Sequence, residues 1–188
     1  MKKTDIPRLT LSAMFLALGF VLPFLTGQNP QIGAMLLPMH LPAILCGFVC
    51  SWPYGLAVGF LMPVVRSAFL GMPPMMPTAL AMAFELAAYG GVAGLLYGKL
   101  HREPVNVYGS LIAAMLCGRA AWGLASLALY AAFTNNAFTL ALFWAGAFGN
   151  ALPGILGQLA LVPLIVFALE RMKLIPLKRG AQKTTQRA

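Results

Sequence analysis

The chain has 188 residues, of which 60% are hydrophobic and only 9% charged, whereas a soluble domain carries about a quarter charged residues. This much apolar surface excludes a soluble globular fold and favours an integral membrane protein, whose polar backbone groups are satisfied inside helices. The net charge of +9 would suit nucleic-acid binding, but the basic residues lie in short flanks between apolar stretches, which argues against it.

Six apolar runs of membrane-spanning length follow one another along the chain. A spanning helix needs about 20 apolar residues, and Pro, Gly, Asn and charge clusters separate the runs. In chain order, the predicted helices are 9–26, 35–50, 53–70, 78–100, 107–133 and 138–172. We therefore expect an all-α integral membrane protein with six transmembrane helices, which forms a single membrane domain over residues 1–188.

The basic residues indicate the orientation of these helices. Three precede the first helix, Lys99 and Arg102 follow the fourth, and six lie between 171 and 187, whereas the connections 27–34, 71–77 and 134–137 contain no Lys or Arg. Cytoplasmic loops carry the excess of positive charge, so both termini are predicted to be cytoplasmic. The polar, basic tail 178–188 is expected to be disordered and close to anionic lipid headgroups.

Small residues recur at a spacing of four in several of the helices. Ala13 and Ala17 lie in the first helix, and the third and fourth helices carry Gly55-x-x-x-Gly59 and Gly90-x-x-x-Gly94. Such residues form a flat stripe against which another helix packs closely. We expect most stripes to pack within the protein, and one on a terminal helix to face a partner subunit.

Arg66, Glu85 and Arg119 are the charged residues that fall well inside the predicted helices. At about 1.5 Å rise per residue, both arginines lie about 18 to 20 Å from the inner ends of their helices, and Glu85 lies about 10 Å from its outer end. All three then occupy one level in the outer half of a hydrocarbon core about 30 Å thick. Charged groups at this depth need a partner or a wet cavity, so we expect one shared site.

The three charges allow two interpretations. Glu85 and one arginine form a structural ion pair that locks two helices together, or they bind a ligand directly. Two arginines against one glutamate leave a surplus positive charge, which an anionic ligand would neutralise. Because the arginine fork suits a carboxylate, a small carboxylate-bearing solute is the first candidate. A cationic ligand would instead be met by Glu85.

Further polar and aromatic residues share these helix faces. Arg119, Trp122 and Ser126 follow i, i+3, i+7 spacing, and Glu85 and Tyr89 are i, i+4 neighbours. For the aromatic residues, the alternative to ligand binding is ordinary helix packing or an interfacial belt. We interpret His40 as an interfacial polar residue near the outer surface rather than as a metal ligand. The predicted substrate-binding set is Arg119, Glu85, Arg66, Asn150, Trp122, Tyr89, Trp144 and His40.

Two outer connections, 27–33 and 71–77, combine Gly and Pro with Met and Ile and carry no charge. Solvated loops are more polar, so we expect these segments to fold over a site as lids, with a tight turn as the alternative.

Nucleotide-binding, metalloprotease and hydrolase motifs are absent from the sequence, so we expect no enzyme, no ATPase of its own and no cofactor. Cys46, Cys50 and Cys117 lack the spacing of a zinc site and are expected to be free thiols.

Several of these motifs occur together in one known family. The runs Leu37-Pro-Met-His-Leu-Pro42, Gly71-Met-Pro-Pro74 and Glu85-Leu-Ala-Ala-Tyr-Gly90, with the Ala13 and Ala17 stripe and six helices, resemble the substrate-binding S components of energy-coupling factor (ECF) transporters, which take up vitamins in prokaryotes. The resemblance covers almost the whole chain.

The resemblance implies a subunit of the cell membrane that binds a vitamin near the outer face. It also implies that Ala13 and Ala17 dock on a transmembrane coupling subunit joined to two ATPases, and that the loaded subunit topples to release the vitamin inside. The Pro and Met signatures are most similar to the branch associated with pantothenate. Folate-like and pyridoxine-like ligands stay as alternatives, as does a membrane scaffold or sensor whose charges only hold helices together.

Overall fold

The computed structural model describes residues 5–27, 29–100, 104–133 and 138–172, and every regular element in these ranges is helical. In chain order the elements are α1 Asp5–Val21, the 3-10 helix η1 Leu22–Thr26, α2 Pro30–Leu36, α3 His40–Cys50, α4 Trp52–Leu70, the distorted turn η2 Met75–Ala79, α5 Leu80–Lys99, α6 Pro104–Phe133, α7 Leu140–Trp144, the wide turn η3 Ala145–Gly149 and α8 Leu152–Arg171. Six helical stretches in these ranges are long and apolar enough to cross a membrane. The prediction of an all-α membrane protein with six transmembrane helices is confirmed.

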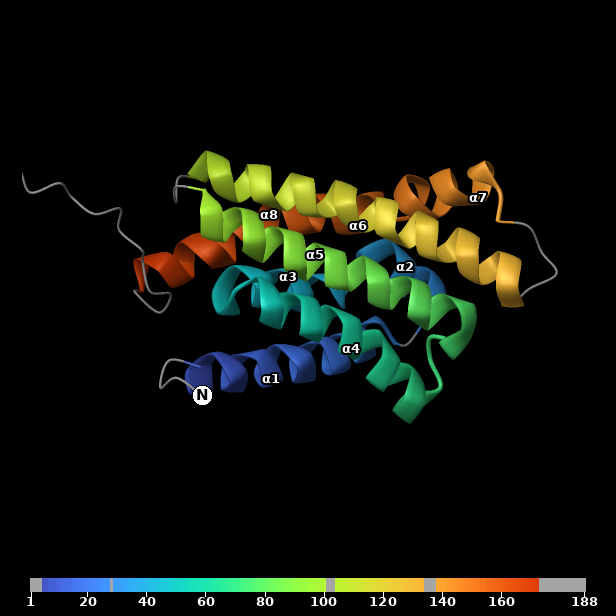
Figure 1. The fold of residues 1–188 in the computed structure, drawn as a ribbon, viewed down its shortest axis with the longest axis horizontal. Helices are drawn as coiled ribbons and strands as arrows, with labels where there is room; N and C mark the ends of the chain where they lie inside the picture. The colour runs from blue at the N-terminus through green and yellow to red at the C-terminus, as the bar shows by residue number, and fades with distance from the viewer. Residues whose placement is uncertain (1–4, 28, 101–103, 134–137, 173–188) are drawn as a thin grey trace, which may run out of the picture.

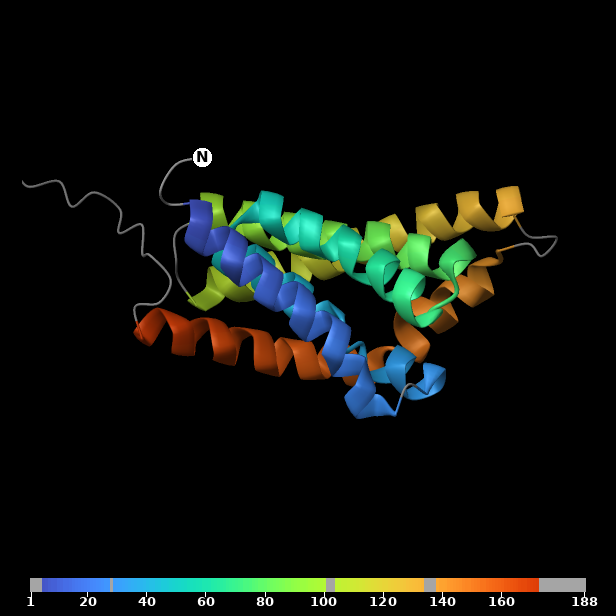
Figure 2. The ribbon, with the colours of Figure 1, turned by 90° about the horizontal axis from the view of Figure 1, so that it is seen from below.

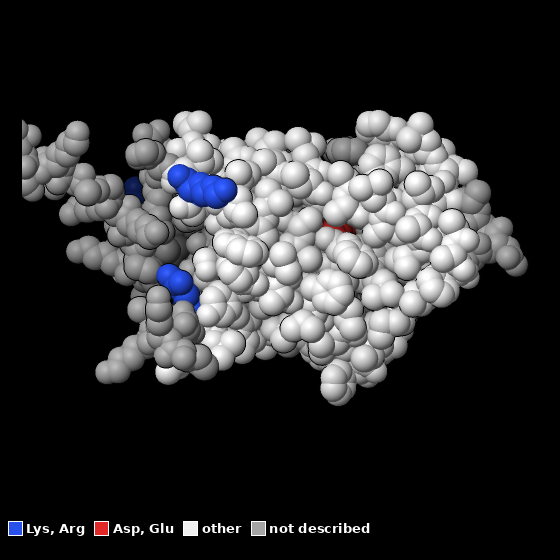
Figure 3. All heavy atoms as spheres, in the orientation of Figure 1, with Lys and Arg blue, Asp and Glu red and all other residues white. Residues whose placement is uncertain are grey.

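Helix α1 begins and helix α8 ends at the same end of the helix bundle. The start of α1 and the end of α8 lie together at the left of Figures 1 and 2. Basic side chains gather at this end on the face shown in Figure 3, in line with Arg8 in α1, Lys99 in the last turn of α5 and Arg171 at the end of α8. That this end is cytoplasmic stays a prediction, and the predicted tail 178–188 lies outside the described residues.

The second span departs from its prediction. Residues 27–34 were expected to form a loop before one helix, 35–50, but the structure has the short helix α2 there, followed by a break and α3. The Asn29 side chain caps α2 by accepting a hydrogen bond from the Gln31 amide at 2.9 Å, and a proline at the first helical position favours the start. Leu37 has left-handed backbone angles, and its amide donates to the Gly33 carbonyl, which ends the helix.

The prediction of one long helix over 138–172 is wrong. The structure divides this range into α7, η3 and α8, with the interruption near Asn150. Gly146 and Gly149 have poor helix propensity, and Pro153 is placed in the first turn of α8, where its missing N–H is tolerated. Figure 2 shows the bend between α7, in orange at the right, and α8, in red along the lower edge.

Helix α5 is the centre of the bundle and packs against α3, α4 and α6 (Figure 1). The predicted glycine stripes make this packing close. A Cβ atom at Gly59 would lie 2.2 Å from the Leu86 carbonyl oxygen, and one at Gly90 would lie 2.3 Å from the Gly55 carbonyl oxygen. These glycines therefore pack internally, as the sequence indicated.

Helix α1 uses only one side for internal packing. It contacts α3 and α4, whereas Ala13 and Ala17 lie on an exposed side with Met14 and Leu18. Within the described residues, the small-residue stripe of this helix is therefore left exposed. Helix α1 presents an apolar face with small residues at its centre, against which another helix can pack closely.

Candidate ligand-binding site

A cavity of about 550 Å³ lies toward the end of the bundle opposite the start of α1 and the end of α8. It is lined by η1 and α2, the start of α3, α4 with the following connection and η2, the first half of α5, the middle of α6, and η3 with the next residue. Its lining residues are Pro23, Asn29, Gly33, Ala34, Leu37, Pro38, Met39, His40, Arg66, Met72, Pro73, Pro74, Thr78, Met82, Glu85, Arg119, Trp122, Gly146 and Asn150. The volume falls in the range of small-molecule sites.

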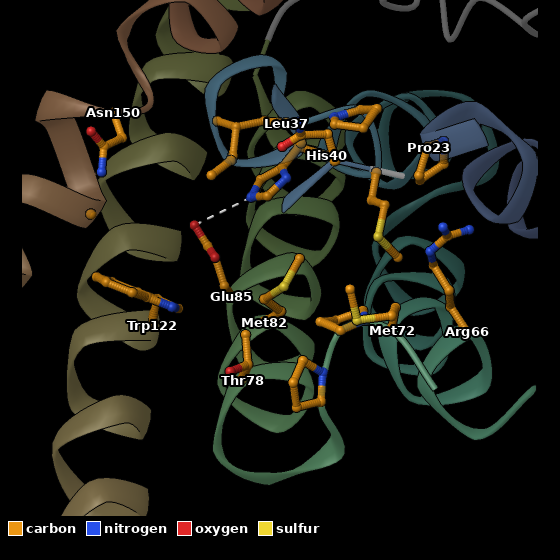
Figure 4. A pocket seen from close by; sticks show the side chains of 18 of the residues that line it. Pro23, Leu37, His40, Arg66, Met72, Thr78, Met82, Glu85, Trp122 and Asn150 are labelled. Atoms are coloured by element: carbon orange, nitrogen blue, oxygen red, sulfur yellow. Dashed lines mark ion pairs between the residues drawn. The ribbon is translucent and has the colours of Figure 1, made fainter. Parts of the chain in front are cut away.

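One wall of the cavity carries a cluster of buried ionisable side chains. Arg119 on α6 donates from Nη1 to Glu85 Oε1 on α5 at 2.6 Å. His40, the first residue of α3, places Nε2 3.3 Å from the same carboxylate oxygen, and Figure 4 shows the two side chains pointing toward each other. Arg119, Glu85 and His40 are only 5%, 2% and 1% exposed, so three helices bring three polar groups into a poorly hydrated space.

This cluster is not satisfied by the protein alone. Within the described residues, Arg119 Nε and Nη2, His40 Nδ1 and the Tyr89 hydroxyl are buried without a hydrogen-bond partner, and His40 Nε2 has only its 3.3 Å contact with Glu85. Leaving such groups unpaired in a protein interior is costly. Unpaired donors beside a small-molecule cavity indicate a surface that completes its hydrogen bonds with a bound ligand.

Arg66 lies on another wall and does not pair with Glu85. Its Nη1 donates to the Phe20 carbonyl oxygen of α1 at 2.6 Å, and its guanidinium carbon lies 5.8 and 5.1 Å from the ring centres of Phe20 and Phe24. Figure 4 shows Arg66 across the cavity from Trp122. The predicted trio thus lines one cavity, and the partner of Glu85, which the sequence left open, is Arg119.

The space between the two walls is apolar. Met72 and Met82 lie between Arg66 and Glu85 in Figure 4, and four prolines join the lining. Both charge-free outer connections contribute to it, through Asn29, Gly33 and residues 72–74. Sequence reasoning missed Met82, because a methionine within a membrane-spanning helix carries no signal that separates a cavity from ordinary packing.

The remaining predicted residues divide between the lining and its surroundings. Trp122 and Asn150 line the cavity; the ring of Trp122 is stacked on Phe143 at 6.0 Å, and a Cβ at Gly146 would lie 2.7 Å from it. Tyr89 and Trp144 are not among the lining residues.

Tyr89 and Trp144 occupy opposite environments. Tyr89 is fully buried on α5 and presents its ring edge-on to His40 at 5.1 Å between centres, so it packs behind the cluster. Trp144 is 57% exposed in α7. Six of the eight predicted residues therefore line the cavity, and Tyr89 and Trp144 do not.

The charges of the side chains in this site do not balance. With His40 neutral, its two arginines and one glutamate leave a formal surplus of one positive charge. Among the residues that the structure describes, no group of three His, Cys, Asp or Glu side chains is placed to hold a metal ion. Cys46 and Cys50 are buried thiols and Cys117 is an exposed thiol.

Comparison with known proteins adds one finding. Residues 7–166 match the model of a family described as "ECF transporter, substrate-specific component". No curated protein and no solved structure matches the chain. The matched range covers most of the chain and includes every cavity-lining residue.

Proposed function

Because the chain belongs to the ECF transporter substrate-specific component family, and is thus a substrate-specific membrane subunit, we propose that it captures a small water-soluble vitamin in this cavity. The observation that carries the proposal is the buried Arg119, whose Nε and Nη2 have no hydrogen-bond partner among the described residues. A ligand carboxylate beside this guanidinium would pair with donors that the protein leaves free.

Pantothenate is our first candidate. It has one carboxylate for the surplus positive charge, an amide and two hydroxyls for Asn150, Thr78 and Arg66, and a branched aliphatic centre that suits the methionines and prolines. One specific observation favours a second candidate of the pyridoxine type, since the Trp122 ring at the cavity wall would also accept a flat heterocycle. A folate-like ligand stays as the third.

The position of the cavity supports uptake from outside. It lies toward the end of the bundle opposite the start of α1 and the end of α8. With both termini cytoplasmic, as the charge distribution predicts, the vitamin enters from the outer face. We place the protein in the cell membrane, where a transmembrane coupling subunit and two ATPases would drive release of the vitamin inside.

The direct test is calorimetric titration of the purified protein with a panel of pantothenate, pyridoxine and folate. We expect one vitamin to bind in a 1:1 ratio at submicromolar concentration. At a hundredfold excess over Kd it should raise the free energy of unfolding by about 2.7 kcal/mol, visible as a higher melting temperature. Absence of both heat and thermal stabilisation for the whole panel would contradict the proposal.

The exposed face of α1 supports docking of the coupling subunit. Ala17→Trp places a large ring on the small-residue stripe, so we expect loss of co-purification with the coupling subunit and ATPases, while vitamin binding is kept. The control is Leu124→Trp, on an exposed position of α6, which should leave co-purification unchanged. Recovery of the complex with Ala17→Trp at the wild-type level would exclude this face as the docking surface.

A further inference from the structure

Arg66 joins the lining of the cavity to α1 through a hydrogen bond. Its side chain is only 3% exposed and starts from α4. From there it donates to the Phe20 carbonyl and lies over the rings of Phe20 and Phe24, while Pro23, between these two aromatic residues, lines the same cavity. Arg66 therefore contacts both the ligand space and the end of the helix that presents the small-residue stripe.

The Phe20 carbonyl is available to Arg66 because of the local sequence. After Val21 the chain changes from an α-helix to the 3-10 helix η1, in which a carbonyl accepts from the amide three residues ahead. The Phe24 amide, which would be the α-helical partner of the Phe20 carbonyl, is therefore directed to the Val21 carbonyl, and Pro23, three residues after Phe20, has no N–H. The arginine supplies the missing donor, so the end of α1 depends on a side chain from another helix.

The contact between Arg66 and α1 lies where α4 and α1 pack closely, so a movement of Arg66 can affect α1. One turn before Arg66 on α4, Met62 packs so closely on α1 that a Cβ at Gly19 would lie 2.1 Å from its sulfur. Within the described residues, one guanidinium N–H is used on Phe20, whereas the group carries five donors in a rigid plane. The same guanidinium can hold the carbonyl, the two rings and a ligand at once.

We propose that Arg66 couples occupancy of the cavity to the end of α1: a ligand acceptor group bound by Arg66 orders the guanidinium and thereby rigidifies η1. This inference rests on the proposed function. The bound ligand then stabilises the end of α1, the helix proposed to dock on the coupling subunit, without contacting the docking face. By linkage, docking changes vitamin affinity by the same factor as the vitamin changes docking affinity.

The test is hydrogen exchange of the amides in residues 22–27, with and without saturating pantothenate or the vitamin that the panel identifies. We expect exchange in the wild type to slow about tenfold on binding, the scale of one hydrogen bond to a charged group. Phe24→Leu, which removes a ring outside the cavity lining, should reduce this protection about two- to fivefold. Its vitamin Kd should stay close to the wild-type value.

Matched variants separate coupling from packing. Phe69→Leu removes an exposed phenyl ring from the same helix as Arg66 and should keep the full protection. Arg66→Met should abolish the protection, and Arg66→Lys, which keeps a charged donor, should restore part of it.

The outcomes are distinct for the inference and for the proposed function. Heat of vitamin binding with unchanged exchange at 22–27 would overturn the inference and leave the proposed function standing. Equal protection in Phe24→Leu, Arg66→Met and wild type would also overturn it. Absence of binding by every vitamin would overturn the proposed function and this coupling together.

Discussion

Arg119→Ala is expected to weaken vitamin binding at least about a hundredfold, which corresponds to about 2.7 kcal/mol of binding free energy. Hydrogen bonds to charged groups contribute about 1.5–3 kcal/mol each, and Arg119 has two buried nitrogens free to make them. Alanine also leaves Glu85, which is 2% exposed at the cavity wall, without its arginine partner and with only His40 beside it. The remaining negative charge of Glu85 would repel a carboxylate. Calorimetric titration of the variant gives the Kd directly.

Two further variants make this result specific. Arg119→Lys keeps the charge but loses the planar fork, so its affinity should fall between those of the wild type and the alanine variant. Arg8→Ala removes a basic residue of α1 at the other end of the bundle and should leave the Kd unchanged. Wild-type affinity in a folded Arg119→Ala protein would exclude this arginine as the anchor of the ligand.

The depth argument from the sequence was effective because helices in a membrane run nearly along one axis. A rise of about 1.5 Å per residue placed Arg66, Glu85 and Arg119 at one level, and all three line one cavity. Depth fixes no direction around the helix axis, however. Whether Arg66 points toward Glu85 or toward the Phe20 carbonyl depends on helix rotation and on the donor missing at Pro23, so its contact with α1 was not predicted.

The prediction of one continuous helix over 138–172 failed because it rested on hydropathy. The range 138–172 was treated as continuous, but η3 separates Trp144 from α8, and hydropathy alone does not show such a break in an apolar run. Tyr89 shows a second limit. The i, i+4 spacing correctly put it near the Glu85 face of α5, yet the rotation that directs Glu85 to the cavity buries Tyr89 behind His40.

A double-mutant cycle on Glu85 and Arg119 should show the largest stability effect. Glu85→Gln leaves Arg119 without its anionic partner, and Arg119→Met leaves the Glu85 carboxylate with only His40 beside it. Because both side chains are buried, each single change is expected to lower the free energy of unfolding by about 3–5 kcal/mol. The double variant has no net buried charge from this pair and should recover most of that loss. Thermal unfolding of all four proteins in one detergent measures the cycle.

The same cycle distinguishes a binding site from a scaffold. If the pair only holds α5 to α6, the double variant should bind the vitamin with wild-type affinity once its folding is restored. If Arg119 binds the vitamin, folding returns but vitamin binding stays lost, since a thioether side chain offers no donors in place of the buried guanidinium nitrogens. A stable double variant with wild-type vitamin affinity would therefore assign the pair a structural role, because a group that contacts the ligand cannot be replaced by a methionine without loss of its hydrogen bonds.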